Sequence, residues 1–498
     1  MLFHSLEFFV FFPVVVLVYF IIPKKLKTLW LLAASYYFYM CWNVKHLLLI
    51  ACCTVVSWIS GLLLGRCKRA GRRAKWIAAG SIFFQLGVLV FFKYAGFILQ
   101  NINAVLEKMG ASAWELPFSF ALPAGISFYT FQALGYTIDV YRREVEPEKN
   151  LCSYALFVAF FPQLVAGPIE RSKNLLGQMR SIRARKIGSL FDYDRIAQGL
   201  ILMLWGFFLK LVIADRICIL VDTVYHAWEL YGTVELVVAT AAFSIQIYCD
   251  FAGYSTIARG AAKVMGFTLM ENFRAPYFSK SIREFWRRWH ISLSTWFKDY
   301  LYIPLGGSRR GTVRTYLNLM IVFLASGLWH GASWHYAAWG GIHGVYQAVG
   351  TMTDGMRKRF RERAGTDTRA FSFRAGQVLI TYALSLFGLI FFRADSLSAA
   401  VGICKRILTK LDPWVLANGT LLDLGLEGKE MVILFAALSL LLFFSLVREY
   451  RNETPEMFLH RQSTWFRWLL LVILFCFLFL FGMYGPEYDE SQFIYFQF

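Results

Sequence analysis

The sequence predicts an all-α polytopic integral membrane protein, and three observations support this fold class. Of the 498 residues, 58% are hydrophobic and 18% are aromatic, with a mean hydropathy of +0.50. Only 17% are charged, whereas a soluble domain typically has about 25%. Many apolar runs approach the ~20 residues that a helix needs to cross a bilayer. We therefore expect about 10–12 transmembrane helices.

Candidate spans follow one another from the N-terminus to the C-terminus. In lipid the backbone must satisfy its own hydrogen bonds, so each apolar run should be helical. The stretches 120–168 and 252–350 are apolar but interrupted by Gly, Pro and charge, which indicates short, interfacial or re-entrant helices. No linker divides the chain, so we expect a single domain over residues 1–498. The spans are 6–23, 28–43, 46–65, 76–99, 195–221, 233–251, 313–333, 375–394, 430–447 and 467–484.

The net charge of +19 lies mainly in short loops between the spans. Cytoplasmic loops of membrane proteins are enriched in Lys and Arg, so the charge is explained without a nucleic-acid partner. This rule places four basic loops in the cytoplasm and both termini outside it, in a multi-pass protein of the cell membrane. The nine Cys form no spacing typical of zinc or of a disulfide framework. The four loops are 24–27, 66–75, 171–186 and 357–374.

The stretch 272–344 holds the most informative pattern and is the expected active-site core. Interpreted as one helix from Ser281 to Tyr300, it has an apolar face and a basic, polar face that carries His290. The alternative is an amphipathic helix at the membrane surface. The apolar face holds Phe285, Trp289, Leu293, Trp296 and Tyr300, and the polar face holds Arg283, Arg287, His290, Ser294 and Lys298.

His330 follows an apolar run and is surrounded by small residues, including Gly327 and Gly331. Ionisable residues inside a membrane segment are costly and usually mark a pathway or a reaction site. Burial favours the neutral imidazole, which can act as a base. The alternative is a packing histidine bonded to a carbonyl. His335, expected at a helix end, and His343, expected in a tight helix pair, have no carboxylate at ligand spacing, so we predict no metal site.

Asp250 is the only acidic residue between Glu235 and Glu271, and it lies within apolar sequence. A buried carboxylate needs a partner. Two interpretations stay open: a structural ion pair, with an Arg of the re-entrant region as its partner, or support of the reaction chamber.

Several motifs together resemble the bacterial branch of the membrane-bound O-acyltransferase family. They are FWRRWHISLSTWFKDYLYIPLGG, GLWHG, FFPQLVAGPIERS, YCDFAGYS, the opening FHSLEFFVFFPVVVLVYFIIP and the ending FIYFQF. The chain is most similar to the group that contains the membrane subunits of alginate and peptidoglycan O-acetyltransferases. It departs from that group at Ala252 and Thr256, where Ser and Asp are more frequent, which leaves a polar role of these two positions in doubt.

The resemblance implies helices around a central reaction chamber, with His330 as the catalytic histidine and His290 as its partner. His290 or an indole N–H such as that of Trp329 or Trp334 would stabilise the oxyanion. It implies a cytoplasmic acyl thioester, acetyl-CoA, as donor substrate and no permanently bound cofactor. Arginines near the core suit the donor phosphates, although the positive-inside rule explains them equally. They are Arg274, Arg283, Arg287, Arg288, Arg309 and Arg310.

The acceptor implied by the resemblance is an extracellular polysaccharide, reached through a secreted or membrane-anchored acetyltransferase partner. Two alternatives stay open. One is D-alanyl transfer to teichoic acid from a carrier-protein thioester, which would use the same histidines. The other is a polysaccharide-precursor transporter or flippase, against which the histidine pair and the missing inverted repeats argue.

The C-terminal tail, residues 485–498, is acidic and then aromatic, and it follows a helix expected to run outward. Aromatic residues at a free terminus are unusual, so something should bury them. They form either a structural plug or a docking segment for Tyr495, the only hydroxyl in the last six residues. In the second case Tyr495 would carry the acyl group as a covalent relay.

Overall fold

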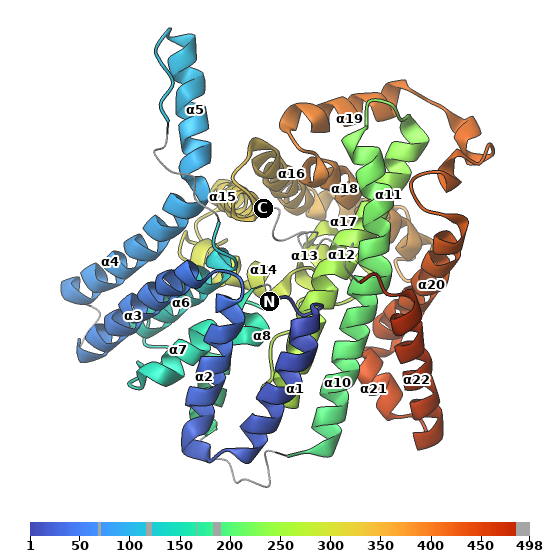
Figure 1. Cartoon of the computed structure of the whole chain (residues 1–498). Coiled ribbons are helices and arrows are strands. Elements are labelled where there is room, and N and C mark those ends of the chain that lie inside the picture. Colours follow the sequence, from blue (N-terminus) through green and yellow to red (C-terminus); the bar gives the residue numbers. More distant parts are fainter. Residues whose placement is uncertain (68–70, 116–121, 166, 183–190, 485–498) are drawn as a thin grey trace. The chain divides into compact units, whose positions relative to one another are not determined.

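The computed structural model describes residues 1–67, 71–115, 122–165, 167–182 and 191–484, and within these ranges every regular element is a helix (Figure 1). This confirms the all-α prediction. The chain packs as two compact units. The first unit contains Met1–Met203 and Ile257–Met270, and the second contains Leu204–Thr256 and Glu271–Phe498.

The first unit is built around α6 and α7, whose residues are almost all buried. Tyr154 of α7 packs on Tyr136 of α6, with ring centres 4.4 Å apart, and donates a hydrogen bond to Ser57 of α3. Its helices are α1 (Leu6–Ile21), α2 (Lys24–Met40), α3 (Val44–Arg66), α4 (Arg72–Leu89), η1 (Val90–Tyr94), α5 (Ala95–Lys108), α6 (Ile126–Tyr141), α7 (Leu151–Ala159), α8 (Phe161–Leu164), η2 (Ser172–Leu176) and α9 (Gly177–Ser181).

The second unit holds the expected active-site core. Two helices, α10 (Tyr193–Phe207) and α12 (Thr233–Val264), contribute residues to both units. The other helices are η4 (Phe208–Ala214), α11 (Asp215–His226), η5 (Pro276–Phe278), α13 (Ile282–Arg288), α14 (Ile291–Phe297), η6 (Lys298–Tyr302), α15 (Thr312–His330), α16 (Trp334–Met352), α17 (Asp354–Arg363), α18 (Phe371–Arg393), α19 (Leu397–Thr409), η7 (Pro413–Leu416), η8 (Thr420–Leu422), α20 (Gly428–Arg451), α21 (Pro455–His460) and α22 (Thr464–Phe481).

Each of the ten expected spans falls mainly on helical residues of the structure, and the spans 76–99 and 195–221 each run through three successive elements, α4–η1–α5 and α10–η4–α11. Among the described residues, eight helices are long and apolar enough to cross a membrane. The first two expected spans form the shorter helices α1 and α2, of 16 and 17 residues. The fold is therefore that of a multi-pass membrane protein.

Three helices of the second unit, α15, α16 and α18, form the frame of the expected active-site core. Helix α16 packs on both α15 and α18, and the short α13 contacts α16 and α18. Gly327 and Gly340 allow α15 and α16 to touch along their backbones. A Cβ atom at Gly327 would lie 2.2 Å from the Tyr336 carbonyl oxygen, and one at Gly340 would lie 2.3 Å from that of Phe323. Small residues are thus required at this contact.

Candidate active site

His330 is the last residue of α15, directly before the turn into α16. Its side chain is only 4% exposed, in agreement with the burial expected from the sequence. The ring lies between Trp339 of α16 and Phe392 of α18, with centres 5.2 Å away in both cases and planes nearly perpendicular. The close helix contact at Gly327 and Gly340 holds this end of α15 against α16, so backbone packing positions the imidazole.

The single helix predicted from Ser281 to Tyr300 is wrong. Helix α13 ends at Arg288, and α14 begins at Ile291. Between them His290 has a φ of 41°, in the left-handed region. The side chain is therefore not on an exposed polar stripe but fully buried, and burial lowers the pKa of its imidazole to about 3.

The break in the helix is stabilised by the segment that precedes it. The Asn272 carbonyl oxygen accepts a hydrogen bond from the Ile291 amide at 3.0 Å, and the Asn272 side chain accepts one from the Ser292 amide at 3.2 Å. The Arg274 amide donates to the Arg288 carbonyl at 3.0 Å. These bonds satisfy backbone groups that a continuous helix would have paired internally, so the chain can turn His290 inward.

The structure brings His290 and His330 together. Their ring centres lie 6.4 Å apart. Trp329 lies beside both, 5.8 Å from His290 and 5.0 Å from His330 between ring centres. Phe251 of α12 covers His290 at 4.6 Å. A buried neutral imidazole in this mainly aromatic environment can offer its lone pair to a reacting hydroxyl without exposure to bulk water.

A cavity of about 20 Å³, enough to hold an ordered water, lies next to His330. Besides the tyrosine and tryptophan rings, its lining includes three polar side chains: His330, His343 and Ser385. Sequence reasoning named His343 only as a packing residue or metal ligand. It did not single out Ser385, because one more hydroxyl in an apolar helix that also carries Thr381 and Tyr382 gives little signal. The cavity is also lined by Ile247, Tyr277, Phe285, Trp289, Trp339, Leu389 and Phe392.

Asp250 takes part in a buried ion cluster. It lies on α12, the helix that also carries Phe251. Its Oδ1 lies 2.7 Å from Lys210 Nζ, and Asp215 Oδ1 lies 2.8 Å from the same nitrogen. All three side chains are at most 3% exposed. The predicted ion pair is present, but the predicted Arg partner is wrong, because the π-helical turn η4 places Lys210 next to Asp250.

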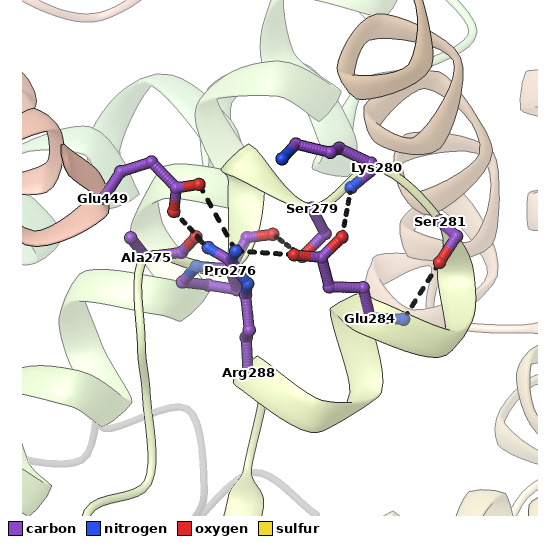
Figure 2. Close-up of polar contacts among 8 residues, drawn as sticks. All are labelled: Ala275, Pro276, Ser279, Lys280, Ser281, Glu284, Arg288 and Glu449. Atoms are coloured by element: carbon purple, nitrogen blue, oxygen red, sulfur yellow. Dashed lines mark hydrogen bonds and ion pairs between the residues drawn. The ribbon is translucent and has the colours of Figure 1, made fainter. Parts of the chain in front are cut away.

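The arginines proposed for the donor phosphates fall into two groups. Arg288 is enclosed by carboxylates: it bonds to Glu284 of α13 and to Glu449 of α20, and also to the Ala275 carbonyl (Figure 2). Its donors are therefore occupied by acidic partners. Arg283, which donates to Thr351 Oγ1 at 2.9 Å, is exposed. Exposed side chains also belong to Arg287, Arg309 and Arg310.

Two further predictions concern metals and the tail. In the part of the chain that the structure describes, no three His, Cys, Asp or Glu side chains come together as a metal site. Tyr495 lies outside the described residues, so the choice between plug and relay stays a prediction.

Comparison with known proteins gives matches over most of the chain. The model of the membrane-bound O-acyltransferase family matches residues 118–392. The probable alginate O-acetylase AlgI of Pseudomonas putida is 38% identical over 464 residues, which cover 91% of this chain and 89% of that protein. A peptidoglycan O-acetyltransferase of Helicobacter pylori is 33% identical, over 80% of this chain and 78% of its own. A teichoic acid D-alanyltransferase of Streptococcus thermophilus is 31% identical over only 44% of this chain and 55% of its own.

Proposed function

The chain belongs to the membrane-bound O-acyltransferase family, and we propose that it transfers an acetyl group from a cytoplasmic thioester to hydroxyl groups of a polysaccharide outside the membrane. One observation carries the proposal: two buried histidines, His290 and His330, lie 6.4 Å apart between ring centres, and His330 lines a cavity. The relatives that match over most of the chain are named for O-acetyl transfer to alginate and peptidoglycan, which supports an acetyl donor and a polysaccharide acceptor.

His330 is the base in this proposal. Attack of a hydroxyl on a thioester requires removal of the hydroxyl proton, and general-base catalysis of such a step contributes about 10²–10⁴-fold. A buried, neutral imidazole has the lone pair that this requires. His290 is its partner, which helps to hold the reacting groups, with Trp329 packed against both rings. Asp250, held by Lys210, supports the chamber wall next to Phe251.

The donor is acetyl-CoA, and it reaches the site from the cytoplasm. The exposed arginines Arg283, Arg287, Arg309 and Arg310 supply cations for its phosphates. The positive-inside rule supports a cytoplasmic location for these arginines and for the basic helix α17. We therefore place the protein in the bacterial cytoplasmic membrane with both termini outside the cytoplasm.

The acceptor polysaccharide is acetylated outside, through a secreted or membrane-anchored partner enzyme. Tyr495 is the proposed relay: it would accept the acetyl group and pass it to the partner. Tyr495→Phe removes only the hydroxyl, so it should abolish acetylation of the polymer in cells. Normal acetylation by Tyr495→Phe would leave the tail with a structural role.

The central test compares His330→Ala with His226→Ala, a change at an exposed histidine at the end of α11. Inside-out membrane vesicles are supplied with radiolabelled acetyl-CoA, and the release of CoA thiol and the label on polysaccharide are measured. His330→Ala should lose both, and His226→Ala should retain both. Turnover of wild-type protein with a D-alanyl carrier-protein thioester, but not with acetyl-CoA, would instead identify D-alanyl transfer.

A further inference from the structure

The cavity beside His330 is lined by a second imidazole, that of His343 of α16. Its side chain is 2% exposed. Trp339 lies one turn earlier on the same helix, with its ring centre 5.2 Å from His330 and 5.1 Å from His343. The two histidines thus border the same space, with one indole between them.

The hydrogen bond from Trp286 fixes the tautomer of His343. Trp286 of α13 donates its indole N–H to His343 Nδ1 over 3.3 Å. An indole nitrogen can only donate, so Nδ1 must be the acceptor. Burial favours the neutral ring, and a neutral imidazole with an unprotonated Nδ1 carries its proton on Nε2. His343 is therefore a hydrogen-bond donor at Nε2.

A glycine of α18, Gly388, leaves room for the Nε2 edge of His343. A Cβ atom at Gly388 would lie 2.9 Å from His343 Nε2, closer than an ordinary contact. Ser385 and Leu389, on either side of Gly388 in sequence, line the cavity. Trp339 adds a second observation, because its buried indole N–H has no acceptor among the described residues. Two donors, and not only a base, therefore border this cavity.

We propose that His343 is a catalytic residue whose Nε2–H binds the carbonyl oxygen of the acyl thioester and stabilises the oxyanion that forms there. This rests on the proposed function. The acceptor oxygen attacks the carbonyl carbon, the carbonyl π electrons move to the oxygen held by His343, and His330 takes the hydroxyl proton. The carbonyl then re-forms, the C–S bond breaks, and the leaving thiolate takes the proton from His330. The products are an ester and a free thiol.

Two conservative substitutions separate donation from packing. In His343→Gln the amide nitrogen can occupy the position of Nε2, so a donor remains. In His343→Asn the shorter amide reaches only the position of Nδ1, where it can still accept from Trp286. Loss of one oxyanion donor typically costs about 10²–10³-fold in kcat. We expect His343→Asn and His343→Ala to lose that factor and His343→Gln to stay within about tenfold of wild type.

Rates are measured in inside-out vesicles with acetyl-CoA, and stability is measured by thermal unfolding of the detergent-purified variants. Wild-type turnover of acetyl-CoA tests the proposed function separately, because the variants are compared only with an active wild type. Equal loss in folded His343→Gln and His343→Asn would refute donation at Nε2, as would wild-type rates in both.

A second measurement leaves His343 in place. Trp286→Phe removes the indole N–H that selects the tautomer and keeps a smaller aromatic ring at this position. Trp286 is a positioning residue in this proposal, so kcat should fall several-fold while KM for acetyl-CoA stays constant. An unchanged kcat in Trp286→Phe would refute the tautomer argument even where the His343 variants do not fold.

Discussion

Gly340 of α16 offers a direct test of how the helix frame positions His330. A Cβ atom there would lie 2.3 Å from the Phe323 carbonyl oxygen of α15, whereas an ordinary contact begins at 3.4 Å. Because the opposing atom belongs to backbone, Gly340→Ala must separate the helices by about 1 Å. His330 ends α15 and should move with it. A displacement of about 1 Å at a reacting group can cost ~10²-fold, so we expect kcat to fall by about that factor.

The matched control is Gly350→Ala on the same helix, where a Cβ atom meets nothing within 4 Å. Alanine favours a helix over glycine by about 1 kcal/mol, so this variant should keep its rate and stability. Both are assayed with acetyl-CoA in inside-out vesicles, with the amount of membrane-inserted protein measured in parallel. Wild-type turnover by Gly340→Ala would show that the α15–α16 contact does not position His330.

Three other predictions concern charged residues. Lys210→Met removes the cation shared by Asp250 and Asp215. It should lower the free energy of unfolding by ~3–5 kcal/mol, measured as a lower thermal midpoint, and an unchanged midpoint would contradict a structural ion cluster. Burial raises the pKa of Glu170 to about 7, from a value near 4.5 in the unfolded chain. Between pH 4.5 and 7 the carboxyl group therefore stays protonated in the folded state and is ionised in the unfolded state. Stability should therefore fall by up to ~3 kcal/mol as pH rises through this window, and Glu170→Gln, compared by thermal unfolding at pH 5 and 8, should remove that slope. Arg287→Ala should raise KM for acetyl-CoA more than it lowers kcat, whereas Arg288→Ala, whose partners are carboxylates, should lower stability and leave KM nearly constant.

The fold could be predicted from the sequence because the membrane restricts the possibilities. An apolar run of sufficient length must form a helix in lipid, whatever its neighbours are. The expected span 46–65 accordingly lies within α3, and 375–394 matches α18 except that it starts four residues later and ends one residue beyond it. Ends depend on local capping and are less constrained by hydropathy.

The break at His290 could not be predicted from periodicity. Apolar and polar residues recur at helical spacing on both sides of it, and this spacing predicted one helix. The bonds that stabilise the break come from Asn272, 18 positions earlier in the chain. A periodic pattern describes which face of a helix is buried, but it carries no information about a distant segment that competes for the backbone.

The sequence contains a feature that indicates the partner of Asp250. Lys210 is the only charged residue between Arg195 and Asp215, within an apolar run. A lone lysine in a membrane segment requires an acidic partner, just as a lone aspartate requires a basic one. Pairing the isolated charges of two neighbouring spans would have favoured Lys210 over an arginine of the re-entrant stretch.

The arrangement of the second unit suggests why two separate segments supply the two histidines. The helix break supplies His290 from the stretch that carries the exposed arginines, and α15 supplies His330 at its opposite end from Arg309 and Arg310. With the proposed orientation, the donor side and the acceptor side of the membrane each contribute one histidine. Under the proposed function, a thioester from the cytoplasm and a hydroxyl from outside would meet beside these two rings, whose centres lie 6.4 Å apart, without either carrier crossing the bilayer.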